Sequence, residues 1–253
     1  MSDITVTGTP DYEKSVTELL AAIRKNPVGD IIVRGIEAIN KDLTIVPYNA
    51  GKAAVLGDCN ASTRPADARA AAHEGISGDL PGESGWYRGD PNNPYARMPY
   101  DGTNRTRATG TGSDVQIFFS PETSGKSGCG GGRYGSLPDE VLLHEMVHAL
   151  RAMQGKRNPV PTEGGLKGYD NEEEFLAVVV TNVYMSANNK TQLRADHAGY
   201  TPLKAPLDTS AGFLADAGNW KLMSIYKLIW QPTFGLVGSV VTARFNPFRE
   251  IYR

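Results

Sequence analysis

Two of the four histidines in this chain stand four residues apart, as His144 and His148, with Glu145 directly after the first. On an α-helix, residues four apart lie on the same face, so both imidazoles can reach one metal ion. Glu145 projects beside that face, where it can hold a metal-bound water and accept its proton. This H-E-x-x-H spacing is typical of zinc metallopeptidases. The motif therefore predicts a zinc site with Glu145 as general base.

The residues around the motif favour a largely buried helix. Ser136 can serve as N-cap with Asp139 three residues on, and Pro138 falls in the first turn, where proline is tolerated. Apolar side chains recur up to Gly155, which is expected to end the helix. Histidines and a carboxylate on a buried helix need polar partners, and metal coordination would supply them.

A catalytic zinc site with two histidines needs one more protein ligand. Arg151 and Gln154 occupy the positions at which metzincins carry glycine and a third histidine, so that class is excluded. His197 is a candidate, but it stands among polar residues and glycine, where an ordinary surface histidine is the more common outcome. A downstream carboxylate is the better candidate.

A second helix is predicted from Asp170 to Thr181, because this segment begins with acids and continues with apolar residues. Asp170 is expected to cap the helix and to pair with Glu173 in a variant of the capping box. Glu174 lies furthest inside the helix among these acids, and it is the predicted third ligand, with Glu173 as the alternative. Solvated acids that merely open a helix would also fit, because negative charge is favoured there.

A peptidase also needs a donor for the oxyanion that forms when water attacks a peptide carbonyl. Tyr169, five residues before Glu174, is the first candidate, and Tyr184 on the second helix is the next. Either tyrosine could instead pack with its hydroxyl at the surface, which is the more common arrangement.

The remaining pattern predicts an α+β fold in one domain over residues 1–253. Apolar periodicity indicates strands at 4–8, 43–48 and 114–120 and helices at 12–25, 31–40 and 215–230. From about 58 to 112 the chain is rich in Gly, Pro, Asp and Asn, and such a long irregular stretch is predicted to be a lid or an insertion. Only Ala68 to His73 indicates a helical turn within it, and His73 is expected to be solvated.

The glycine-rich segment from Gly128 to Gly135 contains G-x-G-x-x-G. A dinucleotide site requires a tight turn directly after a strand, and here the loop is too long and enters the motif helix. A flap over the active site is predicted instead.

Composition argues against two kinds of partner. A formal net charge of −2 gives no basic surface for nucleic acid, and no apolar run reaches the length of a membrane span. The N-terminal residues lack the charged and apolar regions of a classical signal peptide. Cys59 and Cys129 form no metal-binding pair, and they could form one disulfide or stay unpaired. Unpaired thiols are favoured, because a chain with this core needs no disulfide.

Two segments resemble the NleD-type effector zinc metallopeptidases that bacteria deliver through secretion systems, namely residues 142–151, LLHEMVHALR, and 171–184, NEEEFLAVVVTNVY. The tetrad from Glu174 to Ala177 is also similar to the E-F-F-A segment that carries the glutamate ligand in anthrax lethal factor. The resemblance implies a zincin-like fold, with a small mixed sheet and His144, His148 and Glu174 as zinc ligands.

The same resemblance implies an edge strand beside the motif helix, on which extended substrate adds as a further strand. Val115 to Ser120 is the predicted strand for this role, and a plain core strand fits its periodicity equally well.

Motif and resemblance together predict a zinc-dependent endopeptidase, a bacterial effector or toxin that cleaves a protein of a target cell. Delivery by a specialised secretion apparatus, with a chaperone as a further partner, is implied by the resemblance alone. The alternative is a protein-binding module whose metal is structural or absent. Glu145 argues against that alternative, because a structural site has no use for a base beside its ligand.

Overall fold

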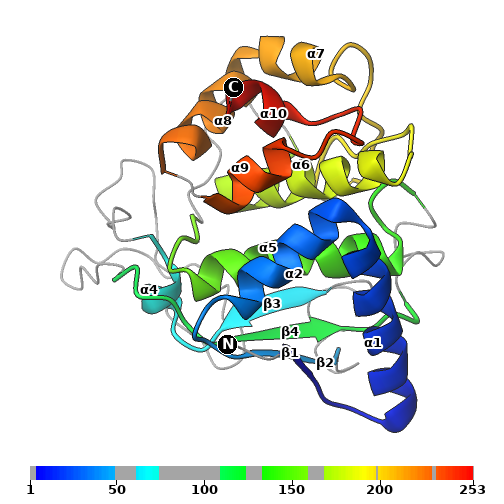
Figure 1. The fold of residues 1–253 in the computed structure, drawn as a ribbon, viewed down its shortest axis with the longest axis vertical. Coiled ribbons are helices and arrows are strands. Elements are labelled where there is room, and N and C mark those ends of the chain that lie inside the picture. The colour runs from blue at the N-terminus through cyan, green and yellow to red at the C-terminus, as the bar shows by residue number, and fades with distance from the viewer. Residues whose placement is uncertain are drawn as a thin grey trace.

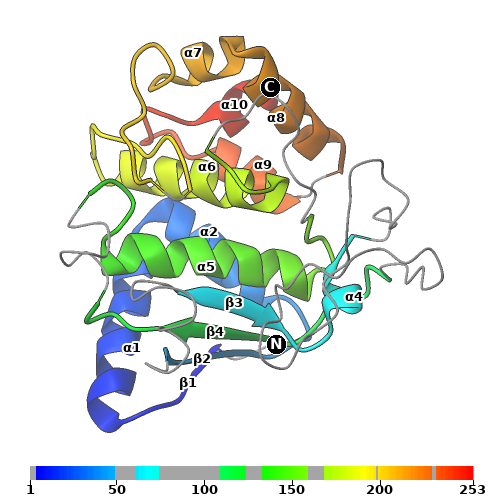
Figure 2. The same ribbon diagram turned by 180° about the vertical axis from the view of Figure 1, so that it is seen from behind.

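The computed structural model describes residues 4–48, 61–73, 109–123, 133–158, 168–197, 199–229 and 232–252. These residues form a mixed α+β structure in which a four-stranded sheet lies on one side and helices are stacked on it (Figure 1). The view from behind shows the same layers (Figure 2). The α+β class predicted from the sequence is confirmed.

Along the chain the strands and helices are β1 (Ile4–Val6), α1 (Pro10–Lys25), α2 (Pro27–Glu37), β2 (Leu43–Pro47), β3 (Ser62–Pro65), α4 (Ala68–Ala71), β4 (Val115–Phe119), α5 (Pro138–Met153), α6 (Glu172–Ala187), α7 (Ser210–Ala215), α8 (Ala217–Ile229), α9 (Pro232–Gly238) and α10 (Pro247–Ile251). Most predicted elements agree with these bounds to within a few residues. The helix predicted at 31–40 instead begins at Pro27, because the Asn26 side chain caps it by accepting from Val28 N and Gly29 N.

The sheet has the strand order β1-β2-β4-β3. β1, β2 and β4 run parallel, whereas β3 is antiparallel to β4 and places Thr63 opposite Ile117. Since β4 is paired on both sides, Val115–Phe119 is the core strand that its periodicity equally allowed, and the edge position that the resemblance implied for it is wrong. Among the described strands, β3 is the edge strand that contacts α5.

The motif helix α5 lies between the sheet and α6 (Figure 1). It contacts β3 and β4 on one side and α6 on another, while α2 packs against both α5 and α6. Alternate residues of β4, namely Val115, Ile117 and Phe119, are buried. The H-E-x-x-H motif of α5, residues 144–148, is therefore packed inside the core.

The C-terminal helices α7 to α10 form a further layer beyond α6 (Figure 2). Aromatic side chains join this layer to α6, because Phe175 stacks on Phe213 at 6.0 Å and Phe213 meets Phe245 edge to face at 5.3 Å. The Ser186 hydroxyl of α6 accepts a hydrogen bond from Phe245 N at 2.8 Å. The last part of the chain therefore braces α6 from behind.

The start of α5 differs by one residue from the prediction. Pro138 is its first residue and Leu137 its N-cap, whose backbone N–H donates to Glu140 Oε2 at 3.1 Å. The Ser136 hydroxyl instead donates to the Arg133 carbonyl oxygen at 2.6 Å, so Ser136 as N-cap is wrong. The Glu140 carboxylate thus accepts from the backbone N–H of the N-cap residue, the part of a capping box that a glutamate at the third helical position supplies.

The end of α5 agrees with the prediction. Gly155 follows the last turn with φ 64°, a left-handed conformation that favours glycine. A Cβ there would lie 2.2 Å from the Gly110 carbonyl oxygen, so the close approach of these two segments also requires glycine.

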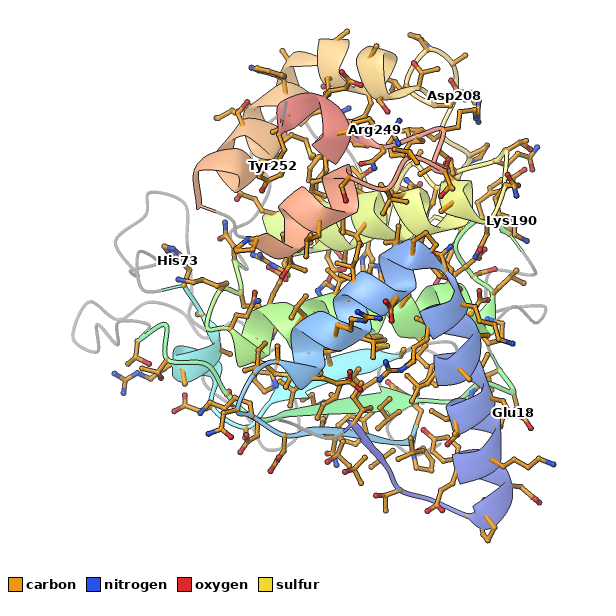
Figure 3. All side chains as sticks on the ribbon, in the orientation of Figure 1. Glu18, His73, Lys190, Asp208, Arg249 and Tyr252 are labelled. Atoms are coloured by element: carbon orange, nitrogen blue, oxygen red, sulfur yellow. The ribbon has the colours of Figure 1, made fainter. Side chains whose placement is uncertain are left out.

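The stretch predicted to be irregular, from about 58 to 112, contains β3 and α4. His73 follows α4 and lies at the periphery of the molecule (Figure 3). Residues 128–132 and both cysteines lie outside the described residues, so the flap and the free thiols stay predictions, as does the single domain. Within the described ranges, no helix combines the length and apolar character that a membrane span requires.

Candidate metal centre

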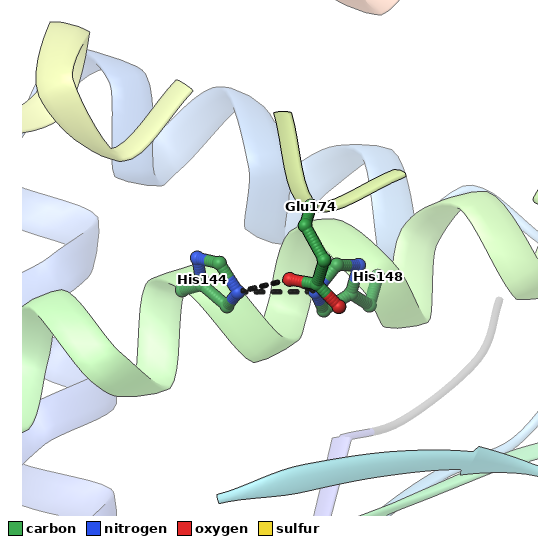
Figure 4. Close-up of side chains that lie close together, drawn as sticks. All are labelled: His144, His148 and Glu174. Atoms are coloured by element: carbon green, nitrogen blue, oxygen red, sulfur yellow. Dashed lines mark hydrogen bonds and ion pairs between the residues drawn. The ribbon is translucent and has the colours of Figure 1, made fainter. Parts of the chain in front are cut away.

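The two motif histidines project from one face of α5 toward α6 (Figure 4). His144 and His148 are both buried, and their Nε2 atoms lie 3.1 Å apart. The rings meet edge to face with centroids 4.7 Å apart. The four-residue spacing thus brings both imidazoles to one point.

Glu174 reaches the same point from the first turn of α6 (Figure 4). Its Oε2 lies 3.1 Å from His144 Nε2 and 3.2 Å from His148 Nε2. The Asn171 side chain caps α6 and accepts from Glu174 N at 2.9 Å, which fixes the backbone from which Glu174 projects. Together His144, His148 and Glu174 form a group that could hold a metal ion.

The geometry of this group fits a tetrahedral metal. Around a zinc ion with bonds of about 2.0–2.1 Å, neighbouring ligand atoms lie roughly 3.3–3.4 Å apart, close to the separations found here. In the neutral form that binds a metal, with its proton on Nδ1, each histidine turns an Nε2 lone pair toward the Glu174 oxygen. Three such lone pairs repel one another unless a cation lies among them.

The charges around the group favour a cation. Burial lowers the pKa of His144 to about 3, so its imidazole is neutral. Burial also acts to lower the pKa of His148, but Glu174 and Glu173 outweigh it and raise that pKa to about 10. Burial opposes ionisation of Glu174, yet His148 and His197 hold its pKa well below the ordinary value. Ionised carboxylates beside buried imidazoles attract a positive charge.

Glu145 is buried beside the group, on the side of α5 that faces β3. Its carboxylate Oε2 accepts a hydrogen bond from the Thr63 hydroxyl at 2.7 Å. Burial raises the pKa of Glu145, while His148 and the Thr63 hydrogen bond oppose that shift. A carboxylate with a raised pKa accepts a proton more readily than an ordinary glutamate.

Glu173 is not the capping partner that the sequence predicts. The N-cap of α6 is Asn171 rather than Asp170, which frees Glu173 for a buried ion pair with Arg151, at 2.6 Å between Oε1 and Nε. Glu173 Oε1 also lies 3.6 Å from His148 Nδ1. A carboxylate behind a metal-binding histidine orients the ring and favours the tautomer with its proton on Nδ1.

His197, expected to be an ordinary surface histidine, lies at the site. Its ring stacks on His144 with centroids 5.6 Å apart, and its Nε2 lies 3.2 Å from Glu174 Oε2. Its Nδ1 is 2.9 Å from Asp170 Oδ2. Asn182 of α6 holds the loop through two hydrogen bonds of 2.8 Å to the Arg194 backbone. The contact between His197 and Glu174 joins segments that are not adjacent in the chain, so no local sequence pattern predicts it.

The two tyrosines proposed as oxyanion donors have other contacts. Tyr169 meets Phe175 edge to face at 5.2 Å, and the Tyr184 hydroxyl donates to Asp139 Oδ2 at 2.8 Å. Neither is among the described residues around the small cavity of about 40 Å³ at the motif. The described residues that line it are Ala61, Val141, His144, Glu145, Arg194, His197 and Tyr200. The oxyanion role of Tyr169 stays a prediction.

A buried H-E-x-x-H helix that meets a glutamate of a second helix defines a candidate metallopeptidase centre. Residues 1–200 match the family model Peptidase_M91, described as "Effector protein", and the chain belongs to this family. The resemblance to NleD-type effector metallopeptidases is thereby confirmed. No curated protein and no solved structure matches the chain.

Proposed function

We propose that this protein is a zinc-dependent endopeptidase that acts as an effector on a protein of a target cell. The observation that carries the proposal is the convergence of His144, His148 and Glu174 within 3.2 Å of one another, next to Glu145. Membership of a peptidase family of effectors supports the reaction class. A zincin-like fold accords with the mixed sheet and the two helices that meet at the site.

Zinc is the metal that this set of ligands suits best. Two imidazoles and one carboxylate form a common catalytic zinc site, which keeps a position for water or substrate. A zinc ion there would supply Lewis acidity toward a peptide carbonyl and lower the pKa of water.

The side chains of this protein would do the remaining work. Glu145 would accept a proton from the attacking water and return it to the leaving amine. Tyr169 remains the residue predicted to donate to the oxyanion. His197 lies closer to the metal ligands, where it holds Glu174 in place.

The edge strand β3 is suited to bind the substrate backbone. Its outer side is unpaired among the described strands, and Thr63 on it contacts the general base. An extended peptide could add to this edge as a further strand, with its scissile bond next to the metal. The role predicted for Val115–Ser120 thus passes to Ser62–Pro65.

The family description also bears on where the protein acts. Effectors operate in a target cell, so we propose delivery through a specialised bacterial secretion system, with its apparatus or a chaperone as partner. The substrate is then a protein of the recipient cell.

The direct test compares the wild type with Glu145→Gln and with the control Glu172→Gln, all loaded with zinc. Cleavage of a random peptide library is followed by mass spectrometry. We expect Glu145→Gln to keep its zinc and to lose roughly 10²- to 10⁴-fold in turnover, and the control to stay active. Full activity of Glu145→Gln would contradict the mechanism. If the wild type binds zinc but cleaves no peptide, the result would favour the alternative, a protein-binding module without catalytic activity.

A further inference from the structure

Thr63 lies within the edge strand β3, and its hydroxyl meets the catalytic motif. Its Oγ1 is 2.7 Å from Glu145 Oε2 and 3.0 Å from the Glu145 carbonyl oxygen. Thr63 is 3% exposed and Glu145 8% exposed. Contact between two nearly buried side chains 82 residues apart in sequence is a property of the fold rather than of one segment.

The chemistry of a hydroxyl decides which of these two oxygens of Glu145 receives the stronger hydrogen bond. A threonine hydroxyl carries one hydrogen, and an ionised carboxylate accepts a shorter and stronger bond than a neutral carbonyl. The shorter contact is the one to Glu145 Oε2, so the hydroxyl hydrogen is assigned there. This hydrogen bond engages only the Oε2 atom of the Glu145 carboxylate. The Oε1 atom is the one that the proposed mechanism directs at water.

The strand gives this contact a rigid base. β3 is paired with β4, with Thr63 opposite Ile117, and it packs directly against α5. A glutamate side chain has several rotatable bonds, and a catalytic group must be held to within about 0.5 Å of its productive position. A donor on a paired strand supplies such a restraint.

We propose that Thr63 is a positioning residue for the general base, whose hydroxyl holds one oxygen of the Glu145 carboxylate and thereby aims the other at the reacting water. The inference rests on the proposed function of Glu145. It also couples two tasks, because the strand on which the substrate is proposed to add is the strand that orients the base.

A purely structural role for Thr63 is the competing explanation. In that case the hydroxyl would only join β3 to the Glu145 carbonyl oxygen on α5. Loss of the hydroxyl would then lower stability and leave the catalytic step unaffected.

The kinetic test uses Thr63→Val, which removes the hydroxyl at nearly constant shape, and Thr63→Ser, which keeps it. The probe is a fluorescence-quenched peptide selected for cleavage by the wild type from a random library. We expect Thr63→Val to lower kcat about 10- to 100-fold, as part of the general-base contribution, with KM within about twofold and zinc content unchanged. Thr63→Ser should keep kcat within about threefold.

A double variant shows whether Thr63 acts through Glu145. In a Glu145→Gln background, Thr63→Val should change the residual turnover by less than about twofold, because residues that act as a unit are non-additive. Any of three results would overturn the proposal. Thr63→Val could keep the wild-type kcat, the double variant could show the full additional loss, or Thr63→Ser could be as impaired as Thr63→Val.

Crystal structures of the zinc-loaded full chain test the inference without turnover. The wild type and Thr63→Ser should show one Glu145 conformer within hydrogen-bond distance of residue 63, and Thr63→Val a displaced or divided carboxylate. An unmoved carboxylate in Thr63→Val would refute the positioning role. If the wild type holds zinc but cleaves no peptide, the proposed function fails, while these structures still decide whether Thr63 holds Glu145.

Discussion

Replacement of Arg151 by methionine will strongly destabilise this protein. Arg151 and Glu173 form an ion pair with side chains 0% and 2% exposed, and Nε lies 2.6 Å from Oε1. Removal of the cation leaves a buried carboxylate without its main partner. Breaking a buried pair in this way costs about 3–5 kcal/mol. In a protein of this size, that loss lowers Tm by roughly 6–20 °C.

The double variant Arg151→Met/Glu173→Gln separates the charge from the packing. It removes the carboxylate as well, so it should recover at least half of the stability lost in Arg151→Met, because a buried pair replaced as a whole costs little. Urea and thermal unfolding should be measured in the presence of EDTA, since bound zinc would add its own stabilisation. A loss below about 1 kcal/mol in Arg151→Met, or no recovery in the double variant, would refute this reasoning.

The same pair predicts a pH dependence. Burial alone would raise the pKa of Glu173, but Arg151 and the hydrogen bonds to this carboxylate hold it at about 2. In the unfolded chain the pKa of a glutamate is about 4.3, so the stabilisation is present above that pH and is lost as the pH falls from about 5 toward 2. The wild type should lose stability over this range in EDTA, and the double variant should lose less of it.

Three further predictions concern the surroundings of the candidate metal centre. Asn171→Ala should cost about 1 kcal/mol of unfolding free energy by urea titration, because Glu174 N loses its cap, whereas Asn171→Asp should cost less. His197→Ala should keep the zinc site but raise its Kd about 10- to 100-fold in a chelator competition, since His197 supports Glu174, and an unchanged Kd would contradict that support. Phe213→Ala should cost about 3–5 kcal/mol, because it breaks the aromatic contact with Phe175, and a loss below about 1 kcal/mol would show that the C-terminal layer does not brace α6.

Local sequence patterns predicted the parts of this structure that local physics determines. The four-residue spacing placed His144 and His148 on one face of α5. Apolar periodicity located β2 and β4, and an acidic start followed by an apolar run located α6. The Asn26-Pro27 pair would have located the start of α2, because a capping side chain before proline is a recognised signal for a helix start.

The same local patterns could not predict contacts between residues far apart in the chain. The strand β3 has the sequence S-T-R-P, which lacks an apolar alternation and contains proline, so its place at the sheet edge could not be inferred. Glu173 was expected to cap α6, because nothing local shows that Arg151 from another helix competes for it. Thr63 and His197 reach the site by the same kind of tertiary contact. A sequence therefore predicts the ligands on one helix more easily than the residues that hold them in place.

The measurement that tests the central claim most directly is the zinc content per chain of the wild type, Glu174→Gln and the matched control Glu172→Gln. Each protein is loaded with zinc and dialysed against metal-free buffer. Its zinc content is then measured by inductively coupled plasma mass spectrometry. Glu172 lies two residues before Glu174 in the same helical turn, but its carboxylate accepts from the Asn158 side chain at 2.6 Å rather than facing the histidines. We expect about one zinc in the wild type and in Glu172→Gln, and much less in Glu174→Gln. A wild type that takes up no zinc, or a Glu174→Gln variant that keeps it as firmly, would contradict the assignment.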